Sequence, residues 1–411
     1  MRRGGSLAWS ATCLAPCALA LAASAVQEPA LEPLVRAVLE VGAEDSAEAT
    51  ALELARFGPD ACPVFLDLLA REGGASTGER ALLLALAARL EACRPLLAER
   101  AKPGQPPGAR RAVLRVLEVG GGAEDLRLAA CAAQAEREEA EPDPHALGLL
   151  ERTARAVVTR EGKRGCEALR AVYDEAGEAL KPHWIRALGD VGSEHALELL
   201  GSWVGRPGEP SITLVQEISR AAARLEPPFD EGLRASVRAC LSDGSPALRR
   251  EAALAVGRLS DDESLPLLVT LLEGDSGPRR NAWWALKAIT GLSFREDARP
   301  WSRWVAAEQA WWRERSAPAL AGLRSSDEAT VAAAVQEIAA HRFRRHELAL
   351  ELSAIAGEGS PDRARLVCSA LVQLGSPASR KALEAFLEHD DIGVRRSAAT
   401  GLRAIRGSAE R

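Results

Sequence analysis

The strongest constraint on the fold is an internal repeat. The segment 246–259 reads Pro-Ala-Leu-Arg-Arg-Glu-Ala-Ala-Leu-Ala-Val-Gly-Arg-Leu, and segments 278–289 and 392–405 echo it. The second copy begins about 30 residues after the first, and a period of ~20–50 residues is typical of stacked repeats rather than of one globular core. The chain is therefore expected to form an array of similar units.

Each repeat has the pattern of a pair of amphipathic helices. In segment 246–259 the apolar residues follow the helical period and form one stripe: Leu248, Ala252, Ala255, Val256 and Leu259. A second stripe follows at Leu265, Leu268, Val269 and Leu272. Ala, Leu, Arg and Glu dominate the composition and favour helices, whereas scattered β-branched residues argue against a sheet. One such pair cannot bury both stripes, so neighbouring pairs must stack.

The repeat resembles a known family. The pattern Asp243-x-x-Pro246-x-x-Arg249, with Ala252-Ala253 and Gly257 after it, is similar to the HEAT repeat, in the short bacterial variant related to phycobilisome-lyase repeats. The resemblance covers residues 175–291 and 327–407. It implies an all-α, right-handed superhelical solenoid of stacked antiparallel helix pairs, in an exported bacterial protein. It implies little about function, because such repeats serve many roles.

The same resemblance implies an Asp/Arg ladder between successive repeats. Asp243 and Arg249 have the six-residue spacing of that ladder, and Asp390 and Arg396 reproduce it. The arginines at 249–250, 279–280 and 395–396 form, in the alternative interpretation, a basic stripe. An Asp in the turn before a helix also caps free backbone N–H groups.

The predicted organisation has three parts. Residues 1–25 are expected to be a signal peptide, residues 26–174 irregular helical repeats, and residues 175–411 HEAT-like repeats with a tryptophan-rich insertion at 291–315.

The N-terminus has the features of a secretory signal. Arg2 and Arg3 form a basic region, an interrupted apolar run spans 7–22, and Ala23-Ser-Ala25 is a small-x-small cleavage pattern. The alternative is a lipoprotein signal ending at Cys17. We therefore expect a periplasmic or extracellular protein without a membrane span, since the apolar run is shorter than the ~20 residues that a spanning helix needs.

Charge and cysteine spacing limit the partners and cofactors. The net charge of −6 disfavours nucleic-acid binding, which needs a clustered basic surface. The cysteines form no C-x-x-C pair, so no metal site is predicted. Buried apolar packing would explain them. If any pair bonds, Cys62 with Cys93 is the first candidate, because these residues lie one repeat apart.

Six of the nine tryptophans fall in one short segment, where the repeat is lengthened. They are Trp283, Trp284, Trp301, Trp304, Trp311 and Trp312. Four of them share one face of the helix expected after Pro300, and Glu308 lies on the same face. Two interpretations stay open. The indoles clamp an inserted helix onto the solenoid, or they form an exposed surface for a partner, a peptide or a sugar.

Other chemistry-bearing patterns have simpler explanations. Segment 274–277 matches the Gly-Asp-Ser-Gly of trypsin-like proteases but falls in a turn between helices. His341 and His346, with Arg342, Arg344 and Arg345, are expected to form a solvated basic turn. The acidic pair 261–262 is expected to cap a helix.

No catalytic residue, cofactor-binding residue or metal ligand is predicted, and no cofactor. The sequence favours a non-enzymatic protein–protein interaction scaffold whose concave face, lined by the second helices, holds an extended partner. The alternatives are a carbohydrate- or peptide-binding module built on the tryptophans and a lyase-type cofactor-maturation protein.

Overall fold

In the computed structural model, the described residues are 31–41, 46–71, 76–134, 143–357 and 360–409. They form helices joined by turns, with no strand in these ranges. The expected signal peptide and its alternative at Cys17 lie outside them. No helix of this described part is long and apolar enough to cross a membrane. The all-α class predicted from the repeat is confirmed.

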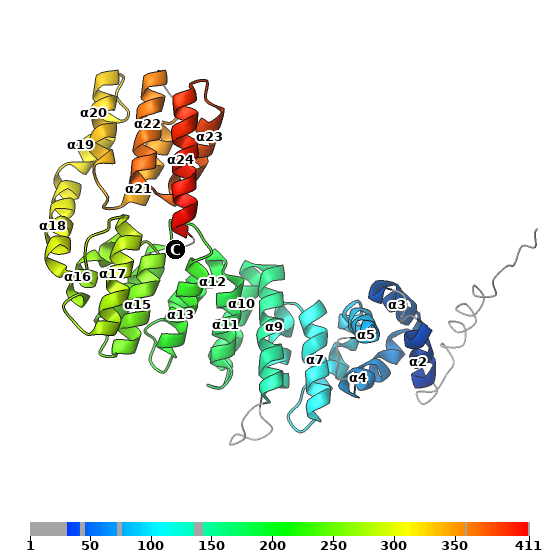
Figure 1. The fold of residues 1–411 in the computed structure, drawn as a ribbon. Coiled ribbons are helices and arrows are strands. Elements are labelled where there is room, and N and C mark those ends of the chain that lie inside the picture. Colours follow the sequence, from blue (N-terminus) through cyan, green and yellow to red (C-terminus); the bar gives the residue numbers. More distant parts are fainter. Residues whose placement is uncertain (1–30, 42–45, 72–75, 135–142, 358–359, 410–411) are drawn as a thin grey trace, which may run out of the picture. The chain divides into compact units, whose positions relative to one another are not determined.

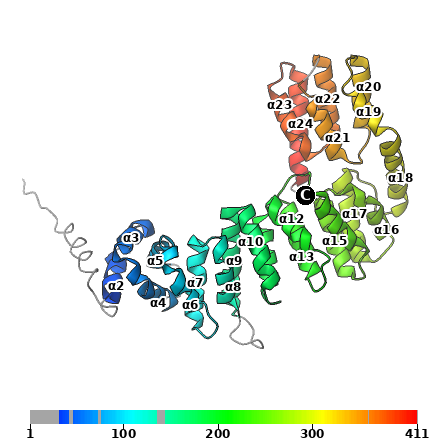
Figure 2. The same ribbon diagram turned by 180° about the vertical axis from the view of Figure 1, so that it is seen from behind.

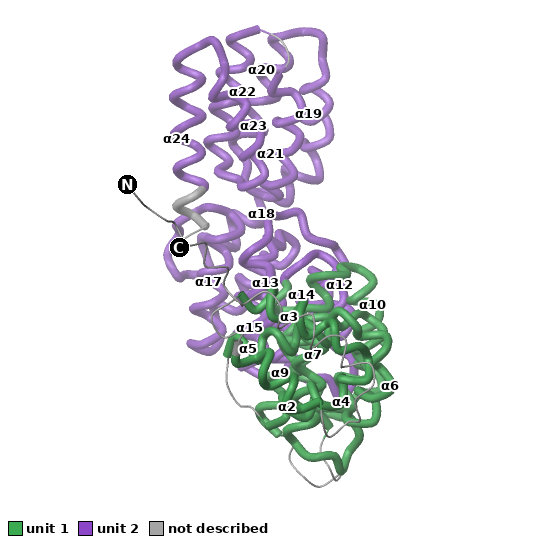
Figure 3. Tube along the Cα trace, turned by 90° about the vertical axis from the view of Figure 1, so that its right-hand side faces the viewer, with its two compact units in different colours: residues 1–191 green, residues 192–411 purple. Residues whose placement is uncertain are grey.

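The chain divides into two compact units, 1–191 and 192–411 (Figure 3). The helices of the first unit run in this order: α2 (Leu31–Val41), α3 (Ala47–Leu54), α4 (Cys62–Arg71), α5 (Thr77–Ala87), α6 (Leu90–Arg100), α7 (Pro107–Gly120), α8 (Leu126–Ala133), α9 (Pro144–Glu161), α10 (Lys163–Glu175) and α11 (Lys181–Val191). Alternate helices α3, α5, α7, α9 and α11 pack side by side (Figure 1).

The second unit contains two stacks with one long helix between them. The first stack is α12 (Glu194–Trp203), α13 (Ser211–Ala222), α14 (Glu231–Ala239), α15 (Pro246–Arg258), α16 (Leu265–Leu271) and α17 (Ser276–Thr290). After α18 (Ala298–Glu314), the second stack is α19 (Ser316–Gly322), α20 (Glu328–Ala339), α21 (Arg345–Ala354), α22 (Pro361–Leu374), α23 (Arg380–Ala385) and α24 (Ile392–Ala409). Helix α18 contacts α16 of the first stack and α19 of the second (Figures 1 and 2).

The start of α15 shows how the sequence sets a helix. Ser245 accepts a hydrogen bond from the backbone N–H of Leu248 at 3.4 Å, and Pro246 occupies the first helical position. Both residues favour a helix start, because the cap satisfies a free N–H and proline supplies none. All five residues of the predicted stripe on this helix are buried, so the stripe is confirmed as the core-facing side.

Neighbouring helices approach closely at glycine. A Cβ built on Gly257 of α15 would lie 2.7 Å from the Trp284 ring and 3.0 Å from the Cα of Ala285 on α17. In the first unit, a Cβ on Gly120 of α7 would lie 2.7 Å from the Cβ of Ala87, at the end of α5. Both units therefore use a missing side chain to bring successive repeats together.

The Asp/Arg ladder is present in the second unit. Arg249 contacts the carbonyl of Asp243 at 2.7 Å and the carboxylate of Asp275 in the next repeat at 3.3 Å. Arg365 likewise pairs with Asp391 at 2.7 Å. The carbonyl of Asp390 is contacted by Arg395, where the sequence pattern pointed to Arg396.

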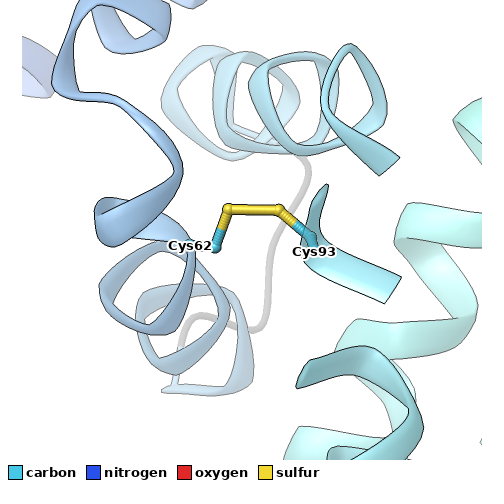
Figure 4. Close-up of a disulfide and its surroundings, with 2 residues drawn as sticks. All are labelled: Cys62 and Cys93. Atoms are coloured by element: carbon cyan, nitrogen blue, oxygen red, sulfur yellow. A yellow bond between two sulfur atoms is a disulfide. The ribbon is translucent and has the colours of Figure 1, made fainter. Parts of the chain in front are cut away.

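The first unit contains a disulfide between Cys62 and Cys93 (Figure 4). It joins the start of α4 to α6, and both cysteines are buried. Packing alone, the first explanation of the cysteines, is therefore wrong for this pair. The remaining cysteines of the described part, at 131, 166, 240 and 368, form no disulfide.

Candidate functional site

The tryptophans of the insertion pack into the second unit. Trp301 is completely buried, and the other five indoles are half-buried. The indole N–H of Trp283 donates to the carbonyl of Phe294 at 2.8 Å, and that of Trp301 donates to the carbonyl of Arg295 at 3.1 Å. Phe294 also packs edge-to-face on Trp301. These contacts hold the loop between α17 and α18.

The last two tryptophans of α18 pack against the core of the second stack. Trp311 stacks on the ring of His341 with centroids 3.7 Å apart and donates to Glu337 at 3.1 Å. The guanidinium of Arg344 lies over the ring of Trp312, 4.7 Å from its centroid. Both indoles therefore pack against the segment that precedes α21.

Glu308, on the predicted indole face of α18, binds the same segment. Its side chain is buried and accepts hydrogen bonds from the backbone N–H groups of Arg342 and Phe343 at 2.9 and 3.0 Å. Its other oxygen lies 3.1 Å from Nδ1 of His341. A carboxylate on the inserted helix therefore fixes the turn that precedes α21.

We call residues 341–346 the arginine turn. The expectation of a solvated basic turn is wrong. Arg345 is largely covered and donates to the carbonyls of Ala288, Gly375 and Leu374 at 2.7, 3.2 and 3.4 Å. His346 is buried. The turn joins α17 of the first stack to the end of α22 in the second, and burial of its charged groups follows from that position.

The acidic segment 261–263 binds the arginine turn from the first stack. The backbone N–H of Arg344 donates to Asp262 at 2.8 Å, and its guanidinium pairs with Glu263 at 2.6 Å. Asp261 is fully buried and pairs with Arg238 at 2.6 Å. Helix capping, the expected role, does not describe these contacts. The contacts of Asp262 and Glu263 with Arg344 join residues about eighty positions apart, which a local sequence pattern does not reveal.

Burial shifts the protonation equilibria in this cluster. It raises the pKa of Asp262 to about 7, with Arg344, Arg345 and the neighbouring Asp261 as the nearby charges. Burial and, to a smaller extent, the nearby charge of Arg345 lower the pKa of His346 to about 3. At neutral pH, His346 is therefore uncharged, and Asp262 is near its midpoint.

A cavity of about 710 Å³ opens beside this cluster, and we call it the junction groove. It lies within the second unit, between residues of the first stack and α21. Its lining residues are Pro227, Pro228, Phe229, Glu231, Arg234, Leu259, Ser260, Asp262, Glu263, Arg344, His346, Glu347 and Leu350. The groove combines apolar walls with carboxylates, so it can accept a ligand that has both an apolar and a cationic part.

His346 is a buried lining residue of this groove. Its Nδ1 lies 2.8 Å from the hydroxyl of Ser376, which itself accepts from the N–H of Ala378 at 3.1 Å. Ser376 is completely buried, and among the described residues its hydroxyl proton has no acceptor other than Nδ1, so the hydroxyl donates to Nδ1 and the imidazole proton resides on Nε2. Nε2 is buried and has no hydrogen-bond partner among the residues that the structure describes.

The tryptophan segment predicted from the sequence and the junction groove consist of different residues. The structure brings Trp311 and Trp312 to the arginine turn, whereas Trp283 and Trp301 hold the preceding loop. None of the six tryptophans lines the junction groove. In the ranges that the structure covers, no group of His, Cys, Asp and Glu side chains is placed to hold a metal ion. The signal that could have found the groove is the charge density of segments 261–263 and 341–347.

Sequence comparison identifies the repeats directly. The family model described as HEAT repeats matches residues 208–287 and 234–301. Together the two matches cover residues 208–301. A search of curated protein sequences found no match to the chain.

Several solved structures align with the chain at low sequence identity. An engineered protein is 16% identical, with 95% of this chain and 98% of that chain covered and a TM-score of 0.32. The karyopherin Kap121p, solved with the extreme C-terminus of the phosphatase Cdc14p, is 10% identical, with 98% and 50% covered and a TM-score of 0.39. The CpcE–CpcF complex of phycocyanin lyase from Nostoc sp. PCC7120 is 16% identical, with 58% and 94% covered and a TM-score of 0.28.

Proposed function

We propose that this protein is a non-enzymatic protein–protein interaction scaffold of the cell envelope or exterior. The observation that carries the proposal is the HEAT-like solenoid itself. Successive helix pairs bury one another along the stack and leave a continuous outer surface of regularly spaced helices. Solenoids of this kind commonly hold extended partners on such surfaces.

The disulfide supports the proposed compartment. Cys62 and Cys93 are bonded although they lie 31 residues apart in the sequence. Disulfides persist in the periplasm and outside the cell, and they are rare in a reducing cytosol. The bond and the signal-like N-terminus are independent features that favour export.

A role for the tryptophan segment in binding stays a prediction, and it now concerns fewer of the six indoles. Trp301 has no exposed surface and is excluded as a contact residue. The other five indoles keep part of their surface open. Trp311 already stacks one ring face on His341, so a flat sugar platform at that ring has at most one free face. A protein or peptide partner that contacts ring edges fits this arrangement better.

The test is capture of a partner followed by reconstitution. The mature protein is immobilised and exposed to the envelope fraction of its own cells, with an unrelated helical-repeat protein as the control bait. Each specifically retained protein is then purified, and its binding is titrated by calorimetry. Saturable binding of a purified partner supports the scaffold. The proposal fails if no retained protein binds saturably on its own.

A further inference from the structure

We propose that the junction groove binds an extended segment of a partner protein in which a lysine or arginine lies next to an apolar residue. This inference rests on the proposed scaffold function and names the site and the partner chemistry. Three properties of the lining residues carry it: the sign of the exposed charge, the open apolar surface and the unpartnered donor of His346.

The exposed charge in the groove is negative. Three exposed carboxylates line it, at residues 231, 263 and 347, against the two guanidinium groups of Arg234 and Arg344. The fourth lining carboxyl group, that of Asp262, is buried. Both guanidinium groups are already paired: Arg234 with Glu231 at 2.6 Å, and Arg344 with Glu263 at 2.6 Å and with Glu347 at 3.3 Å.

The carboxylates are also the more accessible partners in these pairs. The side chains of Glu231 and Glu347 are 57% and 50% exposed, whereas those of Arg234 and Arg344 are 25% and 35% exposed. A ligand that enters the groove therefore meets carboxylate oxygens first. Such a surface attracts a cationic side chain and repels phosphate or an acidic peptide.

The apolar part of the groove is open as well. Leu350 of α21 is 46% exposed. Pro228 is exposed and Phe229 half-buried, and Leu259 forms a buried wall. An isolated exposed leucine needs no explanation. Here the leucine faces the same cavity as two other partly open apolar side chains, and this small apolar surface suits a single apolar side chain of a ligand.

His346 adds a donor for the ligand backbone. Its Nε2–H is buried and unpartnered among the described residues, and burying a donor without an acceptor costs free energy. A carbonyl of an extended peptide is a suitable acceptor, because such a peptide presents carbonyls regularly along its length. The low pKa of His346 keeps this nitrogen a neutral donor at physiological pH.

The experiment measures fluorescence anisotropy of short labelled peptides against the full mature protein. The probe has alternating lysine and leucine at its centre. Two matched peptides replace lysine by glutamate or leucine by serine. We expect saturable binding of the lysine–leucine probe, and at least about tenfold weaker binding of each matched peptide. Added salt should weaken the binding, because the carboxylates are partly solvated.

Two exposed-site variants locate the binding. Glu347→Lys and Leu350→Ser should each weaken binding of the probe by about tenfold or more. Two variants serve as controls. Glu351→Gln changes a residue that is one turn further along α21 and does not line the groove, and Leu52→Ser changes an exposed leucine of the first unit. The affinity of both control variants for the probe should stay within about twofold of that of the wild type. Melting curves of all four variants verify folding.

Several outcomes overturn the inference: no saturable binding of the probe, preference for the glutamate peptide, or equal effects of groove and control variants. Self-association that Leu350→Ser abolishes would assign the groove to a second copy of this chain and also overturns it. If the Glu347→Lys protein still captures the same envelope partner at unchanged affinity, the groove proposal fails and the scaffold stands. If the wild type captures no partner that binds on its own, the scaffold fails.

Discussion

The first unit contains a covalent link between separate repeats, and the second contains a polar link between separate stacks. In the first unit, a covalent bond joins α4 to α6 through Cys62 and Cys93. In the second, guanidinium, carboxylate and carbonyl groups join the two stacks through the arginine turn and residues 261–263. The covalent link fixes two neighbouring repeats. The polar link connects segments about eighty residues apart, and its strength depends on burial and protonation.

The comparison shows where an interruption of the repeat matters. In the second unit the first stack ends at α17 and the second begins at α19, and α18 lies between. At such a break, the facing ends of the two stacks have no neighbouring repeat that covers them. The structure covers them with half-buried indoles and with charged groups that satisfy free backbone carbonyls. The same break leaves the junction groove, so the irregular part of the molecule contains the most specialised surface of the second unit.

The largest expected effect is loss of the disulfide. The double variant Cys62→Ser, Cys93→Ser should lower the free energy of unfolding by about 3–4 kcal/mol, because a loop of about thirty residues is no longer closed in the unfolded chain. Hydrogen exchange should accelerate in α4 and α6 and stay unchanged in α21. Cys131→Ser is the control, since Cys131 is free. Equal protection of α4 with and without reductant would contradict the prediction.

Breaking the polar link should have a smaller effect in the other unit. Arg345→Met leaves the carbonyls of Ala288 and Gly375 without their donor. We expect the free energy of unfolding to fall by about 2–3 kcal/mol. Hydrogen exchange should become faster in α17 and α21 and stay unchanged in α4. Arg313→Met changes an exposed arginine of α18 and should leave stability unchanged. A loss spread evenly over both units would show that they do not unfold separately.

A third change tests the feature that the units share. Gly257→Val would place carbon atoms against Trp284 and the backbone of α17, and overpacking of this kind costs about 2 kcal/mol. Gly120→Val should have a similar cost in the first unit. The control is Gly244→Val, because a Cβ at Gly244 meets no atom within 4 Å. Thermal melting measures all three, and a neutral Gly257→Val would argue against close packing of α15 on α17.

The smallest effect concerns pH and is specific to the polar link. The raised pKa of Asp262 gives stability at low pH that is lost as the pH rises toward about 7. The lowered pKa of His346 acts oppositely: its contribution is present above the unfolded pKa of 6.5 and is lost as the pH falls. The two contributions should nearly cancel near neutral pH.

Asp262→Asn tests this cancellation. The variant keeps an acceptor for the N–H of Arg344 and removes the titration. Its stability should then rise by about 1 kcal/mol between about pH 6 and about pH 8, while that of the wild type changes less. Denaturant titrations at several pH values measure the difference. Parallel pH profiles of the two proteins would contradict the assignment.

Much of the fold was predictable because its signals are local. The stripe on α15, the cap at Ser245 and the Arg249–Asp275 ladder each depend on residues within one repeat or its neighbour. The site was less predictable. The tryptophans stood out by composition, whereas segments 261–263 and 341–346 had ordinary local explanations as caps and solvated turns. The structure refuted those explanations, because Asp262 and Glu263 bind Arg344 of the other stack and Arg345 binds the carbonyl of Ala288 in the first stack.

The sequence by itself determined the helix pairs, their period and the place where the period breaks, since helix propensity and apolar spacing operate over a few turns. Only the tertiary structure decided which cysteines bond, which arginines are buried and where a groove opens. These outcomes depend on how surfaces distant in the sequence meet. The environment created there gives Asp262 and His346 protonation behaviour that neither residue has in an exposed turn.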